Sequence, residues 1–229
     1  CDISLAIIDA VYSSPWIKSS VSGGLVYNTI DDMKNPHSGI YANAMVEVAG
    51  LGGDAQFVKA TARGTYYQTL SEELDVVGLL SGGAGHAWAY GGDGLRVFDQ
   101  FQSNDRMIRG FKYGGIGPYD ASAAGGYDQL GGTSYLNASV EAQFPMPVIP
   151  ENLGLRAAVF ADAATLFGSD ITTPGVTVAG TSMEWRASVG AGIIWASPFG
   201  PIRVDYAVPV LKEEHDQVQE FNFGMSTRF

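Results

Sequence analysis

Alternation of apolar and polar residues runs through most of this chain and constrains its fold more than any other feature. In residues 135–144, for example, Leu136, Ala138 and Val140 are separated by polar residues. Because successive side chains of a β-strand point to opposite faces, this period predicts strands with one apolar and one polar face. The pattern occurs in nine segments: Trp16–Thr29, Gly39–Ala49, Val58–Tyr66, Leu74–Tyr90, Tyr135–Phe144, Leu155–Asp162, Met183–Trp195, Ile202–Val208 and Phe221–Phe229. We therefore expect an all-β fold.

The charged and aromatic residues of these segments indicate which face points inward. The charged residues fall on the polar faces of several strands, as Lys59, Arg63, Glu141, Arg156, Asp162, Glu184 and Arg186. The aromatic residues lie near strand ends, as Trp16, Tyr27, Phe144, Trp185, Trp195 and Phe229. A transmembrane barrel has a polar lumen, an apolar lipid-facing surface and aromatic girdles at both interfaces. A soluble barrel or sandwich would turn the apolar face inward, so we favour a transmembrane antiparallel β-barrel.

The connections between the predicted strands differ in length. Ser197–Pro201 and Met146–Gly154 are compact turns, whereas residues 91–132, 168–181 and 212–218 form longer or more polar loops. Short turns at one rim and long loops at the other are typical of outer-membrane barrels. Single-chain bacterial barrels have an even number of strands. An odd count therefore predicts either the C-terminal part of a larger barrel or a strand that the pattern does not reveal.

Composition and length exclude several classes of protein and of binding site. The 229 residues carry a net charge of −11, which argues against a nucleic-acid partner. No run of 18 apolar residues occurs, so a transmembrane helix is excluded, although barrel strands are not. Cys1 is the only cysteine, so neither an internal disulfide nor a cysteine-based metal site can form. Cys1 is either the lipid-bearing first residue of a mature lipoprotein or a point partway along a longer chain. We expect residues 1–15 to form a loop.

Other short motifs carry little chemistry. The glycine-rich segments Gly91–Gly94 and Gly114–Gly117 lack the strand and helix that flank a phosphate-binding loop. The acidic segment Glu213–Asp216 could bind a cation, but a solvated hairpin loop explains it better. The three histidines lie on different segments without metal-ligand spacing. Because no nucleophile, base and orienting group form a pattern, we predict no enzyme, no metal site and no cofactor.

Several separate stretches resemble the bacterial surface-antigen family of outer-membrane assembly barrels. They are Tyr27–Gly39, Ala49–Asp54, Ile108–Phe111, Phe160–Ala164, Trp195–Tyr206 and Phe221–Phe229. Ile108–Phe111 has the sequence IRGF and matches the hallmark of the family's sixth extracellular loop. Phe160–Ala164 resembles a Phe-x-Asp-x-Gly strand element of the family. The resemblance begins at about Trp16 and implies the C-terminal portion of a barrel of about 16 strands. The periplasmic repeat domains that precede such barrels are not in this sequence.

The resemblance also implies a role for the long loop at residues 91–132. In the family this loop folds back into the lumen, so we expect Arg109 to meet Asp162 on the predicted inward face. A guanidinium can bind a carboxylate through two hydrogen bonds, and each charge would be costly to bury alone. Phe160, on the same face, should pack against the loop. The predicted loop anchor consists of Ile108, Arg109, Gly110, Phe111, Phe160 and Asp162.

The function implied by the resemblance is the assembly and insertion of β-barrel proteins into the bacterial outer membrane. A weakly paired seam could template the edge strand of a client by β-augmentation, because lipid cannot satisfy an unpaired edge. The predicted seam strand and C-terminal signal include Phe221, Phe223, Gly224 and Phe229, and Gly224 should weaken the strand. Expected partners are nascent outer-membrane barrel proteins, accessory assembly-complex lipoproteins and outer-membrane lipid. The alternatives are a translocation or autotransporter-assembly barrel of the same family, a passive diffusion porin and a soluble ligand-binding barrel.

Overall fold

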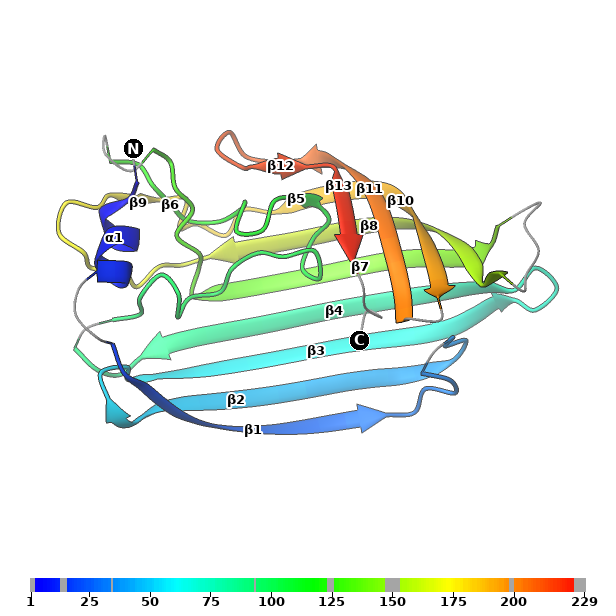
Figure 1. Cartoon of the computed structure of the whole chain (residues 1–229), viewed down its shortest axis with the longest axis horizontal. Coiled ribbons are helices and arrows are strands. Elements are labelled where there is room, and N and C mark those ends of the chain that lie inside the picture. The colour runs from blue at the N-terminus through cyan, green and yellow to red at the C-terminus, as the bar shows by residue number, and fades with distance from the viewer. Residues whose placement is uncertain are drawn as a thin grey trace.

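The computed structural model of the chain describes residues 3–224 except 13–15, 34, 93, 123–125, 147–152 and 198–199. Its main feature is a sheet of nine strands in which neighbours pair in antiparallel fashion (Figure 1). In sheet order the strands are β1 (Lys18–Asn28), β2 (Gly39–Gly53), β3 (Phe57–Ser71), β4 (Val76–Ala89), β7 (Ser134–Pro145), β8 (Leu155–Phe167), β10 (Arg186–Ser197), β11 (Gly200–Leu211) and β13 (Phe221–Gly224). The expected antiparallel all-β fold is confirmed, and each predicted segment contributes one of these strands.

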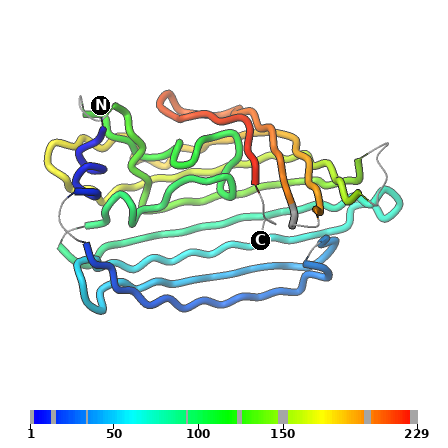
Figure 2. The backbone as a smooth tube through the Cα atoms, viewed as in Figure 1, coloured from blue at the N-terminus to red at the C-terminus, as the bar shows by residue number. Residues whose placement is uncertain are grey.

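The sheet is curved, and its two edge strands, β1 and β13, do not pair with each other. Figure 1 shows β1–β4, β7 and β8 running along the length of the molecule, while β10, β11 and β13 curl over at one side. The tube in Figure 2 shows the same curl, with the green loop segments on the side toward which these strands bend. The described strands therefore form an open arc and not a closed barrel.

The two faces of the sheet differ in the exposure of their side chains. Along β7 and β8, Val140 and Val159 are 59% and 47% exposed on one face. On the other face, Glu141 and Asp162 are 4% and 3% exposed. The apolar side chains of these strands thus point outward and the polar ones inward, as a barrel surrounded by lipid requires.

The connections gather at opposite ends of the sheet because neighbouring strands run in opposite directions. The links β1–β2, β3–β4, β7–β8 and β10–β11 lie at one end, and the longest link, from β4 to β7, lies at the other. In Figure 1, α1 (Leu5–Tyr12) and the short strands β6 (Tyr119–Asp120) and β9 (Val178–Ala179) gather at the end with the longest link. The long loops therefore build a layer of their own at one rim.

Residues 5–12 correct the prediction of a loop over residues 1–15, because they form the helix α1. The helix begins after Ser4, whose hydroxyl accepts a hydrogen bond from the amide of Ala6 and whose carbonyl accepts one from the amide of Ile8. Serine is a favoured N-cap because its side chain satisfies an amide that the helix leaves free. One side of α1 packs against apolar residues of the long loops. Helices this short depend on such tertiary packing, so the local sequence carries little signal for them.

Two other predicted segments need correction in detail. Strand β10 begins at Arg186, so Met183–Trp185 precede it and Glu184 is exposed outside the sheet. The long loop is not wholly irregular, because it contributes β5 (Gly110–Phe111), which pairs with β12 (Val218–Gln219). It also contributes β6, which pairs with β9. These short strands form only because separate loops meet, which a local pattern cannot reveal.

Some predicted features lie partly or wholly outside the described residues. These are Cys1, Phe229 and parts of the compact turns at 146–154 and 197–201. Among the residues that the structure does describe, no helix combines the length and apolarity needed to span a membrane.

Candidate functional site: the loop anchor

The loop between β4 and β7 turns sharply just before β5. The carbonyl oxygen of Asn104 accepts hydrogen bonds from the amides of Met107 and Ile108. Strand β5 then pairs with β12, which fixes the backbone on the other side. Arg109 lies between this turn and β5, and its side chain is 0% exposed. The local backbone thus commits an arginine to the interior, where it needs anionic partners.

Arg109 and Asp162 make the contact that the family resemblance implied. Nε of Arg109 donates to Oδ2 of Asp162 at 2.6 Å, and Nη2 donates to Oδ1 at 2.7 Å. The backbone amide of Arg109 donates to Oδ2 at 3.1 Å, and the hydroxyl of Ser139 donates to Oδ1 at 2.6 Å. A buried ion pair is stable only when its remaining donors and acceptors are also satisfied. Here each carboxylate oxygen of Asp162 accepts two hydrogen bonds.

Glu141 supplies a second carboxylate and links the anchor to β11. Nη1 of Arg109 donates to Oε2 of Glu141 at 2.7 Å. Arg203 donates to both oxygens of Glu141, each at 2.8 Å, and its Nε lies 2.7 Å from Oδ2 of Asp205. Two arginines and three carboxylates therefore form one network, which we name the charge cluster: Arg109, Glu141, Asp162, Arg203 and Asp205. It joins the loop to β7, β8 and β11.

The ring of Phe160 lies against the guanidinium of Arg109. The guanidinium carbon is 3.2 Å from the ring centroid. Gly190 on the neighbouring strand makes room for the ring, because a Cβ at that position would lie 2.5 Å from it. Attraction between a cation and an aromatic face is stronger when both are shielded from water. Phe160 thus supports the face of the guanidinium while the carboxylates bind its edge.

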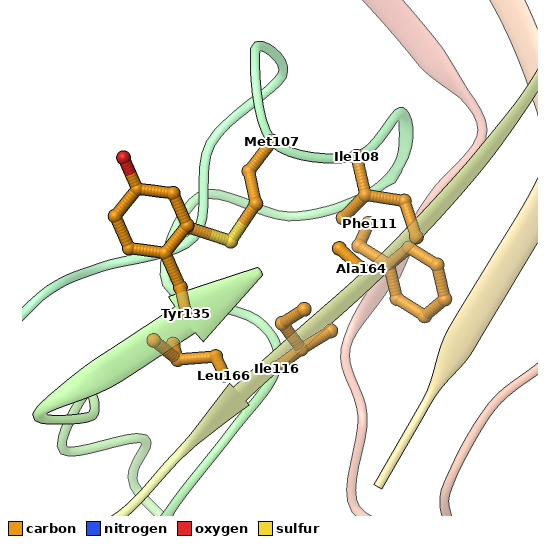
Figure 3. Close-up of a cluster of buried hydrophobic side chains, with 7 residues drawn as sticks. All are labelled: Met107, Ile108, Phe111, Ile116, Tyr135, Ala164 and Leu166. Carbon is orange, nitrogen blue, oxygen red and sulfur yellow. The ribbon is translucent and has the colours of Figure 1, made fainter. Parts of the chain in front are cut away.

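Apolar side chains hold the loop beside the charge cluster. The loop contributes Met107, Ile108, Phe111 and Ile116, and the strands contribute Tyr135, Ala164 and Leu166. Figure 3 shows Ile108 and Phe111 near Ala164, with Met107 beside Tyr135. Complete burial of a large apolar side chain contributes roughly 1.5–3 kcal/mol. The loop is therefore held by ionic and apolar contacts at once.

Gly110 is a position in the loop where the backbone strongly favours glycine. Its φ is +89°, in the region that other residues rarely adopt. A Cβ there would also lie 3.2 Å from the carbonyl oxygen of Ala207 and 3.4 Å from the Cβ of Ser188. Gly110 therefore lets the loop backbone approach β10 and β11 directly.

Arg186 forms an ion pair that is separate from the charge cluster. Arg186 donates to both carboxylate oxygens of Asp216, at 2.9 and 3.1 Å. It reaches Glu184 only through the backbone carbonyl, at 2.9 Å. Asp216 is buried in this pair, so the segment Glu213–Asp216 is not simply solvated. Across the described residues, no group of three or more acidic, histidine or cysteine side chains could hold a metal ion.

Several members of the charge cluster were not predicted as partners of Arg109. Glu141 and Arg203 lie on predicted polar faces, but which polar residues meet depends on the register between strands. In the structure Ser139 lies opposite Asp162, and Glu141 lies opposite Phe160. The available signal was the presence of both signs of charge at inward positions of successive strands.

The structure describes the predicted seam strand as far as Gly224. Strand β13 pairs with β11 from Phe221, opposite Tyr206, to Gly224, opposite Arg203. Phe221 and Phe223 are exposed on the outward face. A Cβ at Gly224 would meet no atom within 4 Å, so packing does not require glycine there. The weakening of the strand by Gly224 stays a prediction.

A second polar contact ties the start of α1 to the long loops. The hydroxyl of Ser4 donates to Asp120 at 2.6 Å, and its amide donates to Asp128 at 2.8 Å. Asp120 also accepts hydrogen bonds from the amides of Ser122 and Thr177, at 2.9 and 3.3 Å. Burial raises the pKa of Asp120, but the hydrogen bonds from Ser4 and the two amides outweigh it. The pKa therefore lies below its ordinary value of 3.8.

Comparison with known proteins places this architecture in a family. A model of the Omp85 superfamily domain matches residues 4–229. The chain belongs to the Omp85 superfamily. It is 35% identical over 213 residues to the outer membrane protein assembly factor BamA of Neorickettsia risticii, covering 93% of this chain and 28% of that protein. It is 28% identical over 204 residues to a SAM50-like protein of Schizosaccharomyces pombe, covering 87% of this chain and 42% of that protein.

The fold of this Omp85 chain also matches a solved structure. The crystal structure of BamA from Haemophilus ducreyi lacking POTRA domains 1–3 superposes with a TM-score of 0.79 at 27% identity, covering 89% of this chain and 41% of that one. The matches confirm the resemblance to outer-membrane assembly barrels that the sequence indicated. The chain spans between 28% and 42% of the length of the curated relatives named above.

Proposed function

We propose that this Omp85 chain is the C-terminal part of a β-barrel in the bacterial outer membrane that assembles and inserts other β-barrel proteins. The observation that carries the proposal is the inward loop anchored by Arg109 and Asp162, in a chain that is 35% identical to BamA of Neorickettsia risticii. Relatives named as BamA and SAM50-like share this stretch of sequence. Since the chain spans only part of those proteins, the activity of the whole protein is an inference.

The proposed mechanism uses the outer edge of the last strand, β13, as a template for client strands. Backbone N–H and C=O groups at a strand edge cannot be satisfied by lipid. A client strand that pairs with β13 would satisfy them by β-augmentation, and its apolar face would become buried in lipid. The process is driven by hydrogen bonding and burial and makes no covalent bond, so the proposed activity is not enzymatic. The proposed partners are nascent barrel proteins, outer-membrane lipid and accessory lipoproteins.

The loop anchor would hold β11 and β13 in place while a client strand pairs with β13. The charge cluster joins the loop to β11, the neighbour of β13. We infer that Ile108, Arg109, Gly110, Phe111, Phe160 and Asp162 hold the loop in the lumen. Strand β11 would then keep its position while a client strand pairs with β13.

Depletion of the full-length protein in cells, with complementation by variants, tests this function. Depletion should lower the amounts of many outer-membrane barrel proteins together, and the wild-type chain should restore them. Arg109→Ala should restore them poorly, whereas Arg63→Ala, which removes an inward arginine outside the charge cluster, should restore them fully. Loss of one secreted protein with normal barrel proteins would instead indicate transport. A large steady conductance of the purified protein in planar bilayers would indicate a porin.

A further inference from the structure

The last stretch of the described chain is divided between two partners. From Phe221 to Gly224 it forms β13 and pairs with β11, and the carbonyl of Glu220 accepts a hydrogen bond from the amide of Ala207 at 2.8 Å. Immediately before, Val218–Gln219 leave the sheet as β12 and pair with β5 of the anchored loop. One continuous segment, residues 217–224, is thus bound at one end to the nine-stranded sheet and at the other end to the anchored loop. We call the sheet the wall and the segment the fork.

The register between β11 and β13 shows which residue of β11 lies where the last strand leaves the sheet. Tyr206 lies opposite Phe221, so the same register would bring Pro209 opposite Val218. Ala207 directs its amide toward the last strand. The residue two positions on, Pro209, faces the same side, since hydrogen-bonding directions alternate along a strand. Proline has no amide hydrogen to donate. The ladder therefore lacks a donor where the last strand turns away.

The loop supplies the partners that the wall lacks. The carbonyl of Gln217 accepts a hydrogen bond from the amide of Lys112 at 2.9 Å, and its amide donates to the carbonyl of Gly115 at 2.8 Å. Gly110 approaches Ala207 closely at the point of division. Backbone polar groups shielded from water need partners, and the loop satisfies those of the diverted residues.

We propose that Pro209 is a positioning residue that divides the last strand between the wall and the loop. The edge that the wall presents then begins near Phe221, and the diverted residues clamp the loop that Arg109 anchors. Loop and edge are coupled, because releasing the loop frees residues 217–219 and extending the edge removes a clamp from the loop. Under the proposed function, Pro209 also sets the length of edge that a client strand meets. The division itself does not rest on that function.

Two disulfide reporters that share one cysteine can distinguish a divided last strand from a continuous one. In the full-length protein with native cysteines replaced by serine, Lys112→Cys with Gln217→Cys reports pairing with the loop. Val210→Cys with Gln217→Cys reports pairing with β11, because the continued register would place these two residues opposite each other. Cysteines form a disulfide only when their Cα atoms are within about 7 Å. With Pro209 present, the 112–217 crosslink should dominate.

Pro209→Val restores the missing donor and introduces a residue that favours strands. It should raise the ratio of the 210–217 to the 112–217 crosslink by roughly two- to tenfold, the effect of one net backbone hydrogen bond. Pro145→Val, at the end of β7, is the matched control and should leave the ratio unchanged. An unchanged ratio in Pro209→Val would overturn the proposal.

Arg109→Ala tests the coupling from the side of the loop. It should lower the 112–217 crosslink, and its combination with Pro209→Val should raise the 210–217 crosslink above that of either single variant. If Arg109→Ala impairs assembly of barrel proteins while both crosslinks stay as in the wild type, the proposed function stands and the coupling fails. If both crosslinks shift as expected while barrel proteins assemble normally, the fork stands and the proposed function fails.

Discussion

The two halves of the sheet have similar polar inward faces but cover them very differently. Under the long loop, Arg109, Glu141 and Asp162 are buried and joined by hydrogen bonds. Over β1–β4, the inward residues Asn43 and Arg63 are only half-buried, and the neighbouring inward residue Val26 is 64% exposed. Within the part of the chain that the structure describes, Arg63 takes part in none of the ion pairs.

This difference shows that the alternation of apolar and polar residues predicts which face a side chain is on. It does not predict whether that face is covered. Val26 and Met45 share the inward face of the first half and are exposed despite being apolar. The anchored part of the loop, around Arg109, packs on the second half and shields its charged groups from water. The loop meets the first half only at one end, where Asp99 approaches Lys18 and Phe101 lies against Lys59. Charges that are shielded from water must be paired, whereas charges on an uncovered face stay hydrated. Identical substitutions in the two halves should therefore have unequal effects.

The strongest test of this comparison replaces one arginine in each half. Arg109→Ala leaves three buried carboxylates with a single arginine and should lower the free energy of unfolding by about 3–5 kcal/mol. Arg63→Ala should change it by less than about 0.5 kcal/mol. Urea unfolding of the full-length protein in detergent, followed by heat-modifiable gel mobility, measures both. Equal losses in the two variants would show that the cover of the loop does not matter.

Replacing one glutamate in each half tests the same comparison, with a smaller expected loss of stability. Glu141→Gln removes a charge that binds both Arg109 and Arg203, but it leaves each arginine with another carboxylate. We expect a loss of about 1.5–3 kcal/mol, typical of hydrogen bonds to charged groups. Glu47→Gln, which breaks the more exposed pair with Lys18 in the first half, should cost less than about 1 kcal/mol. The same urea unfolding experiment measures both losses of stability. A larger loss for Glu47→Gln than for Glu141→Gln would contradict the expectation.

The smallest effect concerns the loop layer outside the sheet, where Asp120 holds α1. Its pKa is lowered on folding, so the stabilisation is complete above about pH 4 and is lost as the pH falls through the lower folded value. Asp120→Asn should weaken this contact by about 1 kcal/mol. Faster hydrogen–deuterium exchange at the amides of α1 would report it, with Glu214→Gln as the control. If acid pH speeds exchange equally in the wild type and Asp120→Asn, another group is responsible.

Most of the sheet could be predicted because its signal is local. A period of two residues specifies both the strands and their faces, as in Val140 and Glu141. The helix α1 could not be predicted in this way, because eight residues do not form a stable helix without the loops that pack against them. The short strand β5 was missed for a similar reason, since its partner β12 lies in a distant loop.

The anchor could be predicted only in part. Family resemblance pointed to Arg109 and Asp162, and alternation placed Asp162 on the inward face. The contribution of Glu141 depends on the register of β7 against β8, and that of Arg203 depends on the curl that brings β11 over the loop. Neither register nor curl is contained in the pattern of a single strand. The charge cluster is therefore a product of tertiary structure.

The aromatic stack at the loop rim has a consequence for recognition by antibodies. His215 packs against two tyrosines of the long loop, with ring centroids 4.3 Å from Tyr127 and 4.7 Å from Tyr119. The side-chain amide of Gln129 joins the same segments by donating a hydrogen bond to the carbonyl of His215, at 3.0 Å. An immunoglobulin directed at this surface contacts two stretches that are distant in sequence. Its epitope is discontinuous, so it would bind the folded antigen but neither linear peptides from these loops nor denatured protein on a blot.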